Sequence, residues 1–393
     1  MYGGKNVVVE RQGFFSRLMG SIGGVFVGVL IAALAFPLLF INEGRAVREA
    51  KGLDEGAAAV IAADTGAVSS QLDGKLVHFT GEATTEQTLS DPQFPISAQA
   101  LGLKRVVEMY QWEEKSEKRK RERVGGGEET ITTYRYNPRW SSKAIDSSRF
   151  NDPGPHRNPP MPFEGSELRA DRITVGAYTL SDALKRQIRG FEPLRVELSE
   201  EDVETWGALH PKPVSVDQGR AYYGTAAATP EIGDVRVSFE VLNPQTISVI
   251  GAQRGEVVDT YKTTVGTSIG LVATGRQSAD EMFASAQAAN TALTWILRGV
   301  GWFMMFMGFS LVLTPVAVLA SIIPPLAILA RAGRAVLAGA GATGLSLLTI
   351  AIGWIFYRPL LGVLLFAAGL SVIVGGVVLV RKRVAASPPA PDA

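Results

Sequence analysis

Four long apolar segments stand out from an otherwise polar chain, one near the N-terminus and three near the C-terminus. A helix needs about 20 apolar residues to cross the hydrocarbon core of a bilayer, which is about 30 Å thick. The predicted transmembrane helices cover residues 18–41, 296–323, 336–357 and 359–380. The first run is too long for a signal-peptide core, so we expect it to remain as an anchor.

Basic residues in the short flanking segments predict how these spans are oriented. Lys and Arg concentrate in residues 1–17, 324–335 and 381–393, whereas Arg358 alone lies in the short loop between the last two spans. Cytoplasmic flanks carry an excess of Lys and Arg, so we expect an N-terminal segment, a loop and a tail in the cytoplasm. The large segment 42–295 is then extracytoplasmic, although basic residues at its start argue weakly against this.

Alternating apolar and polar residues predict that segment 42–295 is rich in β-structure. Every second residue is apolar in residues 235–241, and shorter examples occur at 76–79 and 246–250. A period of two is typical of strands with one buried face. The predicted fold class is therefore an α+β membrane protein with one N-terminal span, three C-terminal spans and a β-rich domain between spans one and two.

A hairpin with a charged tip is predicted within this domain. Residues 106–112 and 130–136 read as its two strands, and residues 113–129 as a long tip. Glutamates interleave with the basic residues of the tip, so a mobile solvated loop is favoured over a site for phosphate headgroups or nucleic acid.

Two amphipathic helices are expected beside the spans. Residues 47–61 place their apolar side chains on one stripe, and Ser278 with Glu281 forms a capping box that opens a helix before span two. We expect both helices to pack on the rest of the protein, with a position in the membrane interface as the alternative.

Small residues line one face of the first span. Gly20, Gly24 and Gly28 recur every four residues and would leave a groove into which another helix fits. Packing against the other spans is favoured, and self-association into a homo-oligomer is the alternative.

Composition removes several classes of function. The 39 Lys and Arg residues nearly balance 38 Asp and Glu residues, so no overall charge favours nucleic acid. The absence of cysteine excludes disulfides, thiolate nucleophiles and Cys-based metal sites. The three histidines, His78, His156 and His210, are too scattered to predict a metal site.

Two short motifs suggest chemistry, and both are better explained without it. Residues 266–270 match the G-x-S-x-G pattern around Ser268, but every histidine lies upstream of that serine. Residues 339–344 spell a dinucleotide fingerprint inside a predicted span, where close helix packing explains the glycines. The spans hold no Asp, Glu or Lys, and only Arg298 lies near an apolar run, at its outer end. We therefore predict no catalytic, cofactor-binding or metal-binding residues.

Six segments in consistent order give the chain a family resemblance. It resembles the LUMA family, also called transmembrane protein 43, in residues 41–46 (Ile-Asn-Glu-Gly-Arg-Ala), 89–92 (Leu-Ser-Asp-Pro), 107–112 (Val-Glu-Met-Tyr-Gln-Trp), 233–239, 302–308 and 353–359. The resemblance supplies signature positions of unknown role, namely Asn42, Glu43, Gly44, Arg45, Glu108, Tyr110 and Trp112.

The resemblance implies four spans and a lumenal domain, and it brings no catalytic residues. Animal members are organisers of the endoplasmic reticulum and inner nuclear membrane that self-associate and bind lamins and emerin, partners not carried over to this bacterial-looking chain. We expect a multi-pass protein of a bacterial inner membrane with a periplasmic domain, or of the endoplasmic reticulum or inner nuclear membrane if it is eukaryotic.

The leading hypothesis is a non-enzymatic scaffold that binds membrane lipids and an unknown protein partner. A transporter or channel component is the alternative.

Overall fold

The computed structural model describes residues 6–123, 127–320 and 324–359, and it is an α+β structure with two compact units. The β-rich unit comprises Met1–Arg11, Gly52–Arg121 and Glu129–Ala286, and the helical unit comprises Gln12–Lys51, Glu122–Glu128 and Gln287–Ala393.

Long helices dominate the helical unit. They are α1 (Phe14–Ala59), α4 (Ala279–Val312) and α6 (Pro324–Tyr357), with the short α5 (Thr314–Ala320) between the last two. Three helices among the described residues are long and apolar enough to cross a membrane: Phe14–Ala59, Ala279–Val312 and Gly333–Tyr357. These contain most of the first three predicted spans, whereas the fourth, residues 359–380, lies almost wholly outside the described residues.

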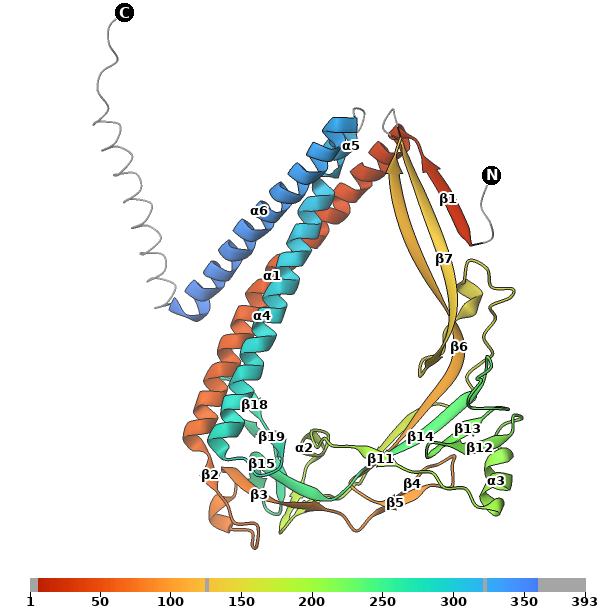
Figure 1. The fold of residues 1–393 in the computed structure, drawn as a ribbon. Helices are drawn as coiled ribbons and strands as arrows, with labels where there is room; N and C mark the ends of the chain where they lie inside the picture. Colours follow the sequence, from red (N-terminus) through yellow and green to blue (C-terminus); the bar gives the residue numbers. More distant parts are fainter. Residues whose placement is uncertain (1–5, 124–126, 321–323, 360–393) are drawn as a thin grey trace, which may run out of the picture. The chain divides into compact units, whose positions relative to one another are not determined.

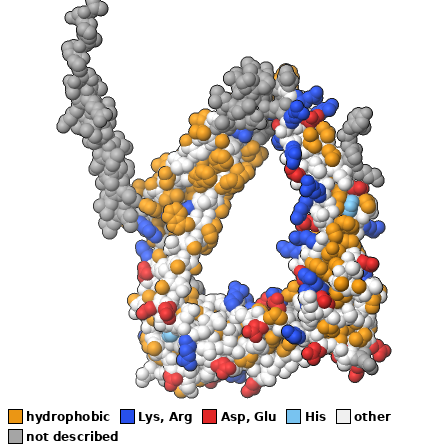
Figure 2. All heavy atoms as spheres, in the orientation of Figure 1, with side chains coloured by type: hydrophobic (Ala, Val, Ile, Leu, Met, Phe, Trp, Pro, Cys, Tyr) orange, Lys and Arg blue, Asp and Glu red, His pale blue; other side chains and the backbone are white. Residues whose placement is uncertain are grey.

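The interior and exterior of the helical unit are both apolar. Ala35, Leu39, Met305 and Ala342 form its buried core where α1, α4 and α6 run side by side (Figure 1). Large apolar side chains such as Phe26 cover the outside, and Figure 2 shows them along the helices. A surface of this kind is typical of helices solvated by lipid.

Two larger sheets form the β-rich unit. The first has the order β1 (Val7–Gln12), β7 (Glu128–Ser141), β6 (Gly102–Glu122), β14 (Val235–Leu242), β13 (Arg220–Tyr223) and β12 (Val214–Asp217), with β11 (Glu192–Leu194) on β14 and β8 (Ser166–Arg169) on β6. The second has the order β19 (Leu271–Thr274), β15 (Gln245–Arg254), β16 (Val257–Asp259), β10 (Tyr178–Leu180), β9 (Thr174–Val175), β3 (Leu76–Thr84) and β2 (Ile61–Ala62).

Small elements complete this unit. They are the strand pairs β4 (Thr88–Ser90) with β5 (Ser97–Gln99) and β17 (Tyr261–Lys262) with β18 (Ser268–Ile269), the helices α2 (Asp182–Lys185) and α3 (Glu200–Gly207), and the 3-10 turns Ser70–Leu72 and Ser147–Arg149.

The predicted strands are confirmed, and each sheet has its own core. Residues 235–241 lie in β14, 76–79 in β3 and 246–250 in β15. In the first sheet Val237 pairs with Val107, close to a core that contains Trp206 and Phe239. In the second, Val249 pairs with Phe79, which stacks on Tyr178. Alternation identified these strands because one face of each is buried.

The prediction of a charged loop at residues 113–129 was wrong, because most of these residues lie in strands. β6 continues to Glu122 and β7 begins at Glu128, so the two form a long ribbon (Figure 1). Cross-strand ion pairs such as Glu113 Oε1 with Arg139 Nε at 3.2 Å help to hold this polar stretch extended. Hydrophobic alternation missed it because a backbone ladder does not require apolar side chains.

The N-terminal strand β1 lies on the outer edge of this ribbon, which the sequence did not predict. The Tyr134 N–H donates to the Asn6 carbonyl oxygen at 2.8 Å. Segments paired in one sheet share one side of a membrane. The charge pattern instead places residues 1–17 and 42–295 on opposite sides, so the pairing and the charge pattern disagree about the N-terminal segment.

The two predicted amphipathic helices are continuous with membrane helices. α1 runs without a break to Ala59, and its Leu53 packs against Ile269 and Phe283 within the β-rich unit. At the start of α4 the Ser278 N–H donates to Glu281 Oε2 at 2.8 Å, and the Glu281 N–H donates to Ser278 Oγ at 3.2 Å. The predicted capping box is confirmed.

Candidate functional site: a buried polar cluster in the helical unit

The signature residue Glu43 lies at the centre of a charged cluster inside the helical unit. Its side chain on α1 is only 1% exposed. Arg298 on α4 donates from Nε and Nη2 to the two carboxylate oxygens at 2.7 and 2.8 Å. Trp354 on α6 donates from its indole nitrogen to Glu43 Oε2 at 2.9 Å. One carboxylate therefore joins three helices.

Aromatic rings cover the guanidinium of Arg298. Its central carbon lies 4.7 Å from the ring centre of Trp295 and 5.7 Å from that of Trp354. A bidentate ion pair and stacked rings offset part of the cost of removing both charges from water. Both carboxylate oxygens of Glu43 thus have donors from the helical unit itself.

A second set of polar contacts continues along α1 and α4. Arg45 donates to Asn290 Oδ1 and Thr294 Oγ1, each at 2.9 Å. Asn42 donates to the Thr294 carbonyl oxygen at 3.1 Å, and Asn290 donates to the Ala46 carbonyl oxygen at 3.0 Å. Residues 42, 45 and 46 share one helix face because they are three or four positions apart. These contacts fix the register of α1 against α4.

Gly44 has a steric role in the same signature. A Cβ at this position would lie 2.6 Å from the Tyr357 ring carbon Cζ. A Cβ on Gly353 of α6 would likewise lie 3.1 Å from the side chain of Glu43. Only glycine lets α1 and α6 approach this closely, so the Asn-Glu-Gly-Arg signature combines polar contacts with close packing.

The glycine groove of the first span is used along part of its length. A Cβ on Gly28 would lie 2.6 Å from the Gly308 carbonyl oxygen of α4, and one on Gly24 would lie 3.9 Å from a Leu311 side-chain carbon. A Cβ on Gly20 would meet nothing within 4 Å. Gly28 therefore serves packing between α1 and α4, and the face at Gly20 is open among the described residues.

The remaining signature residues lie on β6 in the β-rich unit. Glu108 accepts a hydrogen bond from Arg236 at 2.6 Å, and Tyr110 contacts the ring of Trp140. The Trp112 N–H donates to Asn158 Oδ1 at 2.7 Å, which anchors the proline-rich connector of residues 151–162. These residues support the sheet and its connector, and they form a set separate from residues 42–45.

A buried carboxylate also organises the β-rich unit. Asp234, whose side chain is 1% exposed, accepts from the Glu231 N–H at 2.9 Å and from Lys212 Nζ and Tyr222 Oη at 2.5 Å each. Burial by itself would raise the pKa of Asp234, but these donors outweigh it and hold the pKa below its usual range. Burial and the bond to Asp234 raise the pKa of Tyr222.

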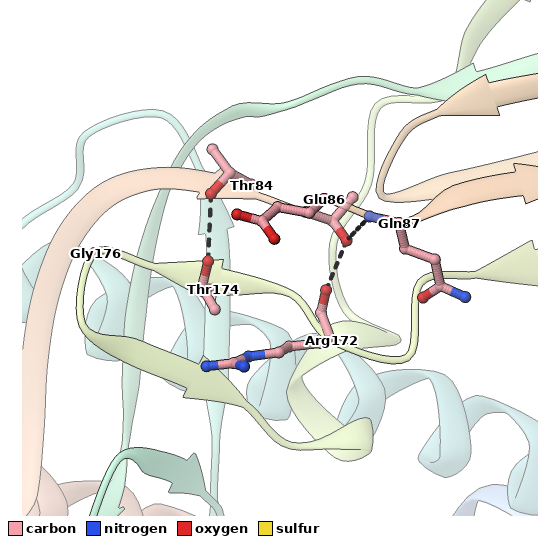
Figure 3. Close-up of a pocket in the computed structure, with 7 residues that line it drawn as sticks. Thr84, Glu86, Gln87, Arg172, Thr174 and Gly176 are labelled. Atoms are coloured by element: carbon pink, nitrogen blue, oxygen red, sulfur yellow. Dashed lines mark hydrogen bonds between the residues drawn. The ribbon is translucent and has the colours of Figure 1, made fainter.

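A polar pocket of about 600 Å³ lies in the β-rich unit (Figure 3). Thr84 Oγ1 and Thr174 Oγ1 lie 3.3 Å apart on its wall, and Thr85 Oγ1 donates to the Arg172 carbonyl oxygen at 2.8 Å. Glu86 also lines the pocket. These residues do not form a nucleophile and base pair, and sequence reasoning did not single them out.

The rejected motifs have ordinary surroundings in the structure. Ser268 lies exposed in β18, opposite Lys262. His78 Nε2 contacts the Gln277 carbonyl oxygen at 2.9 Å, His156 stacks on Tyr136, and His210 lies beside Phe163. No group of three His, Cys, Asp or Glu residues suited to a metal occurs in the part of the chain that the structure describes.

Sequence reasoning did not find the role of Glu43. The predicted span ended at Ile41, so Glu43 counted as the start of the polar domain, whereas it lies buried within α1. Two signals pointed to it: an acid inside an unbroken helical pattern, and Arg298 flanked by Trp295 near the next apolar run. The expectation that the spans hold no acid depended on that boundary.

Apolar helices that contact one another through a closed polar cluster, joined in one chain to a β-rich unit, define a multi-helix membrane protein. The chain belongs to the family described as Transmembrane protein 43, whose model matches residues 109–359.

Relatives from mammals and insects match most of the chain. Transmembrane protein 43 of Rattus norvegicus is 36% identical over 387 residues, which cover 95% of this chain and 93% of the relative. The protein of the same name from Homo sapiens is 35% identical, covering 96% and 94%. The Transmembrane protein 43 homolog of Drosophila melanogaster is 30% identical, covering 88% and 91%. No solved structure gives a significant match.

Proposed function

We propose that this chain is a non-enzymatic membrane scaffold that binds protein or lipid partners through its β-rich domain and self-associates through its spans. The observation that carries the proposal is the closed state of the cluster around Glu43. Both carboxylate oxygens of Glu43 accept from Arg298 or Trp354, so the buried charge of Glu43 serves to hold helices together. That use of charge supports a structural role.

The proposed architecture has four spans, with residues 42–295 outside the cytoplasm and residues 359–380 as the fourth span. The apolar run at 359–380 and the basic flanks support it. The proposed location is a bacterial inner membrane with a periplasmic domain, or the endoplasmic reticulum or inner nuclear membrane if the chain is eukaryotic.

Cysteine labelling tests this architecture cleanly because the chain has no cysteine of its own. Sealed cells that produce one single-cysteine variant each are treated with a membrane-impermeant maleimide. The variants are Val9→Cys, Ser215→Cys and Ser387→Cys. The proposal expects labelling of Ser215→Cys from outside and of Ser387→Cys only after permeabilisation, and the charge pattern expects the same of Val9→Cys as of Ser387→Cys. Labelling of Val9→Cys together with Ser215→Cys would support the pairing of β1 with β7 and overturn the orientation drawn from charge.

Size measurement of the purified chain in nanodiscs tests self-association. Gly20→Leu is the informative variant, because a Cβ at residue 20 would meet no described residue within 4 Å, whereas one at residue 28 would disrupt packing with α4. We expect an oligomer that Gly20→Leu weakens. A monomer at every protein concentration would overturn self-association, and flux of ions or lipids across liposomes that hold the chain would contradict a scaffold.

A further inference from the structure

The ribbon of β1, β7 and β6 separates its charges onto two faces. Alternate residues of a strand point to the same face of a sheet. Glu113 of β6 pairs with Arg139 of β7, and Glu117 pairs with Arg135. The odd-numbered residues of β6 and β7 therefore lie on the same face of the ribbon. The pair of Arg11 with Glu129 joins β1 to that face. We call it the basic face, and its cations are Arg11, Lys115, Arg119, Arg121, Arg135 and Arg139.

The basic face carries an excess of three positive charges. Its six cations face three acids, and each acid is already paired: Glu113 with Arg139 at 3.2 Å, Glu117 with Arg119 at 2.9 Å, and Glu129 with Arg11 at 2.8 Å. Arg121 has no ion pair with any residue that the structure describes. On the opposite face of β6, Lys118 and Lys120 lie on the same side as Glu114.

These cations are accessible and rigidly spaced. The side chains of Arg11, Lys115, Arg119 and Arg135 are between 67% and 79% exposed. Figure 2 shows Lys and Arg side chains gathered along β6 and β7. Residues two apart on a strand are separated by about 6.6 Å, so the face presents a fixed row of positive charge.

The position of this row in the chain favours a membrane as its partner. β1 ends at Gln12 and the membrane helix α1 begins at Phe14, so Arg11 lies three residues before the start of an apolar helix. Phe15 and Met19 in the first turns of α1 are 79% and 69% exposed, as expected for residues in contact with lipid. Because β1 pairs with β7, the outer edge of the ribbon is joined through Gly13 to this membrane helix, and we take β1, β6 and β7 to lie on one side of the membrane, against the charge pattern of residues 1–17.

We propose that the basic face binds the phosphate headgroups of an anionic membrane surface. The proposal rests on the proposed scaffold function and names one partner class, anionic lipid, and the surface that contacts it. Juxtamembrane basic residues gain free energy near anionic lipids, and this attraction weakens as salt screens the charges.

Flotation with anionic liposomes tests the proposal on the full chain. The protein is held in nanodiscs of phosphatidylcholine and mixed with liposomes that contain phosphatidylglycerol or phosphatidylcholine alone. We expect binding to the anionic liposomes only, with loss at high salt. The double variant Arg119→Gln with Arg121→Gln should lower the partition coefficient about 25-fold, because each basic residue lost near an anionic surface lowers it about fivefold.

A matched control removes the same charge from the opposite face. Lys118→Gln with Lys120→Gln should lower the partition coefficient less than fivefold, because those side chains point away from the basic face. Equal losses for the two pairs, or no binding to anionic liposomes, would overturn the proposal. The proposal would also be overturned if the chain bound single-stranded RNA more tightly than liposomes and the double variant Arg119→Gln with Arg121→Gln lost that RNA binding.

The outcome is separable from that of the scaffold proposal. If oligomers persist in nanodiscs while Arg119→Gln with Arg121→Gln leaves liposome binding unchanged, only the basic-face assignment fails. If liposome binding depends on the arginines while the chain is strictly monomeric, self-association fails and the basic face stands.

Discussion

Glu43 in the helical unit and Asp234 in the β-rich unit are both carboxylates whose side chains are 1% exposed, and each has three donors. The donors of Glu43 are side chains 255 and 311 positions away. Those of Asp234 lie within 22 positions and include the backbone N–H of Glu231. The same chemistry therefore joins separate helices in one unit and shapes a local turn beside a strand in the other.

The contrast shows that the part of the structure stabilised by a buried carboxylate depends on which segments supply its hydrogen-bond donors. Removal of Glu43 acts on the assembly of three helices, because no local backbone group replaces Arg298 or Trp354. Removal of the charge of Asp234 leaves most of the sheet hydrogen bonds of β14 in place. Substitutions at the two carboxylates should therefore differ in the size of their effect on stability.

Glu43→Leu should have the largest effect, lowering the stability of the helical unit by about 3–5 kcal/mol because it leaves Arg298 buried without its partner. Unfolding in detergent, followed by circular dichroism, measures this loss. The double variant Glu43→Leu with Arg298→Met should recover most of it. Lys51→Ala, an exposed position on α1, serves as the control. Equal stability of Glu43→Leu and the control would show that the ion pair does not hold the helices.

Gly28→Ala should cost about 1–3 kcal/mol, since the new Cβ would lie 2.6 Å from the Gly308 carbonyl oxygen and 2.8 Å from Leu311 Cβ. The same unfolding measurement compares it with Gly20→Ala, where the methyl group would meet none of the described residues within 4 Å and helix propensity favours alanine. A destabilised Gly20→Ala together with a neutral Gly28→Ala would reverse the assigned packing.

Asp234→Asn should destabilise the β-rich unit by about 1–2 kcal/mol at pH 7, because it weakens bonds to Lys212 and Tyr222. The pKa of Asp234 is lowered in the folded state. Its contribution is therefore complete above the ordinary pKa of about 3.9 and is lost as the pH falls through the lowered folded value. Urea unfolding at pH 7 and pH 3, followed by tryptophan fluorescence, should show a smaller acid loss for Asp234→Asn than for the parent chain.

Ser278→Ala should have the smallest effect, about 0.5–1 kcal/mol, because it removes a cap from the start of α4. Ser268→Ala is the matched control, at an exposed position in β18. Thermal unfolding compares the two. A larger loss in the control would assign Ser268 a role that its surroundings do not indicate.

Structural elements that depend only on residues close together in the sequence could be predicted from it. The alternation of β14, the apolar runs of α1 and α4, and the Ser278 and Glu281 capping box each depend on neighbours within a few positions. The cluster around Glu43 could not be predicted in this way, because its geometry depends on residues from three helices. The β6 and β7 ribbon was missed for a related reason, because the ion pairs that help to hold it extended join residues of different strands.

The separation between Glu43 and its partners also sets an order of events during synthesis. Ribosomes add about 5–20 residues per second, so the 255 positions between Glu43 and Arg298 correspond to roughly 13–50 seconds. During that interval the first helix has been made and its acid has no native partner. The nascent chain must keep Glu43 in contact with water or with the insertion machinery until α4 emerges. The sequence separation of this one ion pair therefore sets the earliest time at which α1 and α4 can pack together.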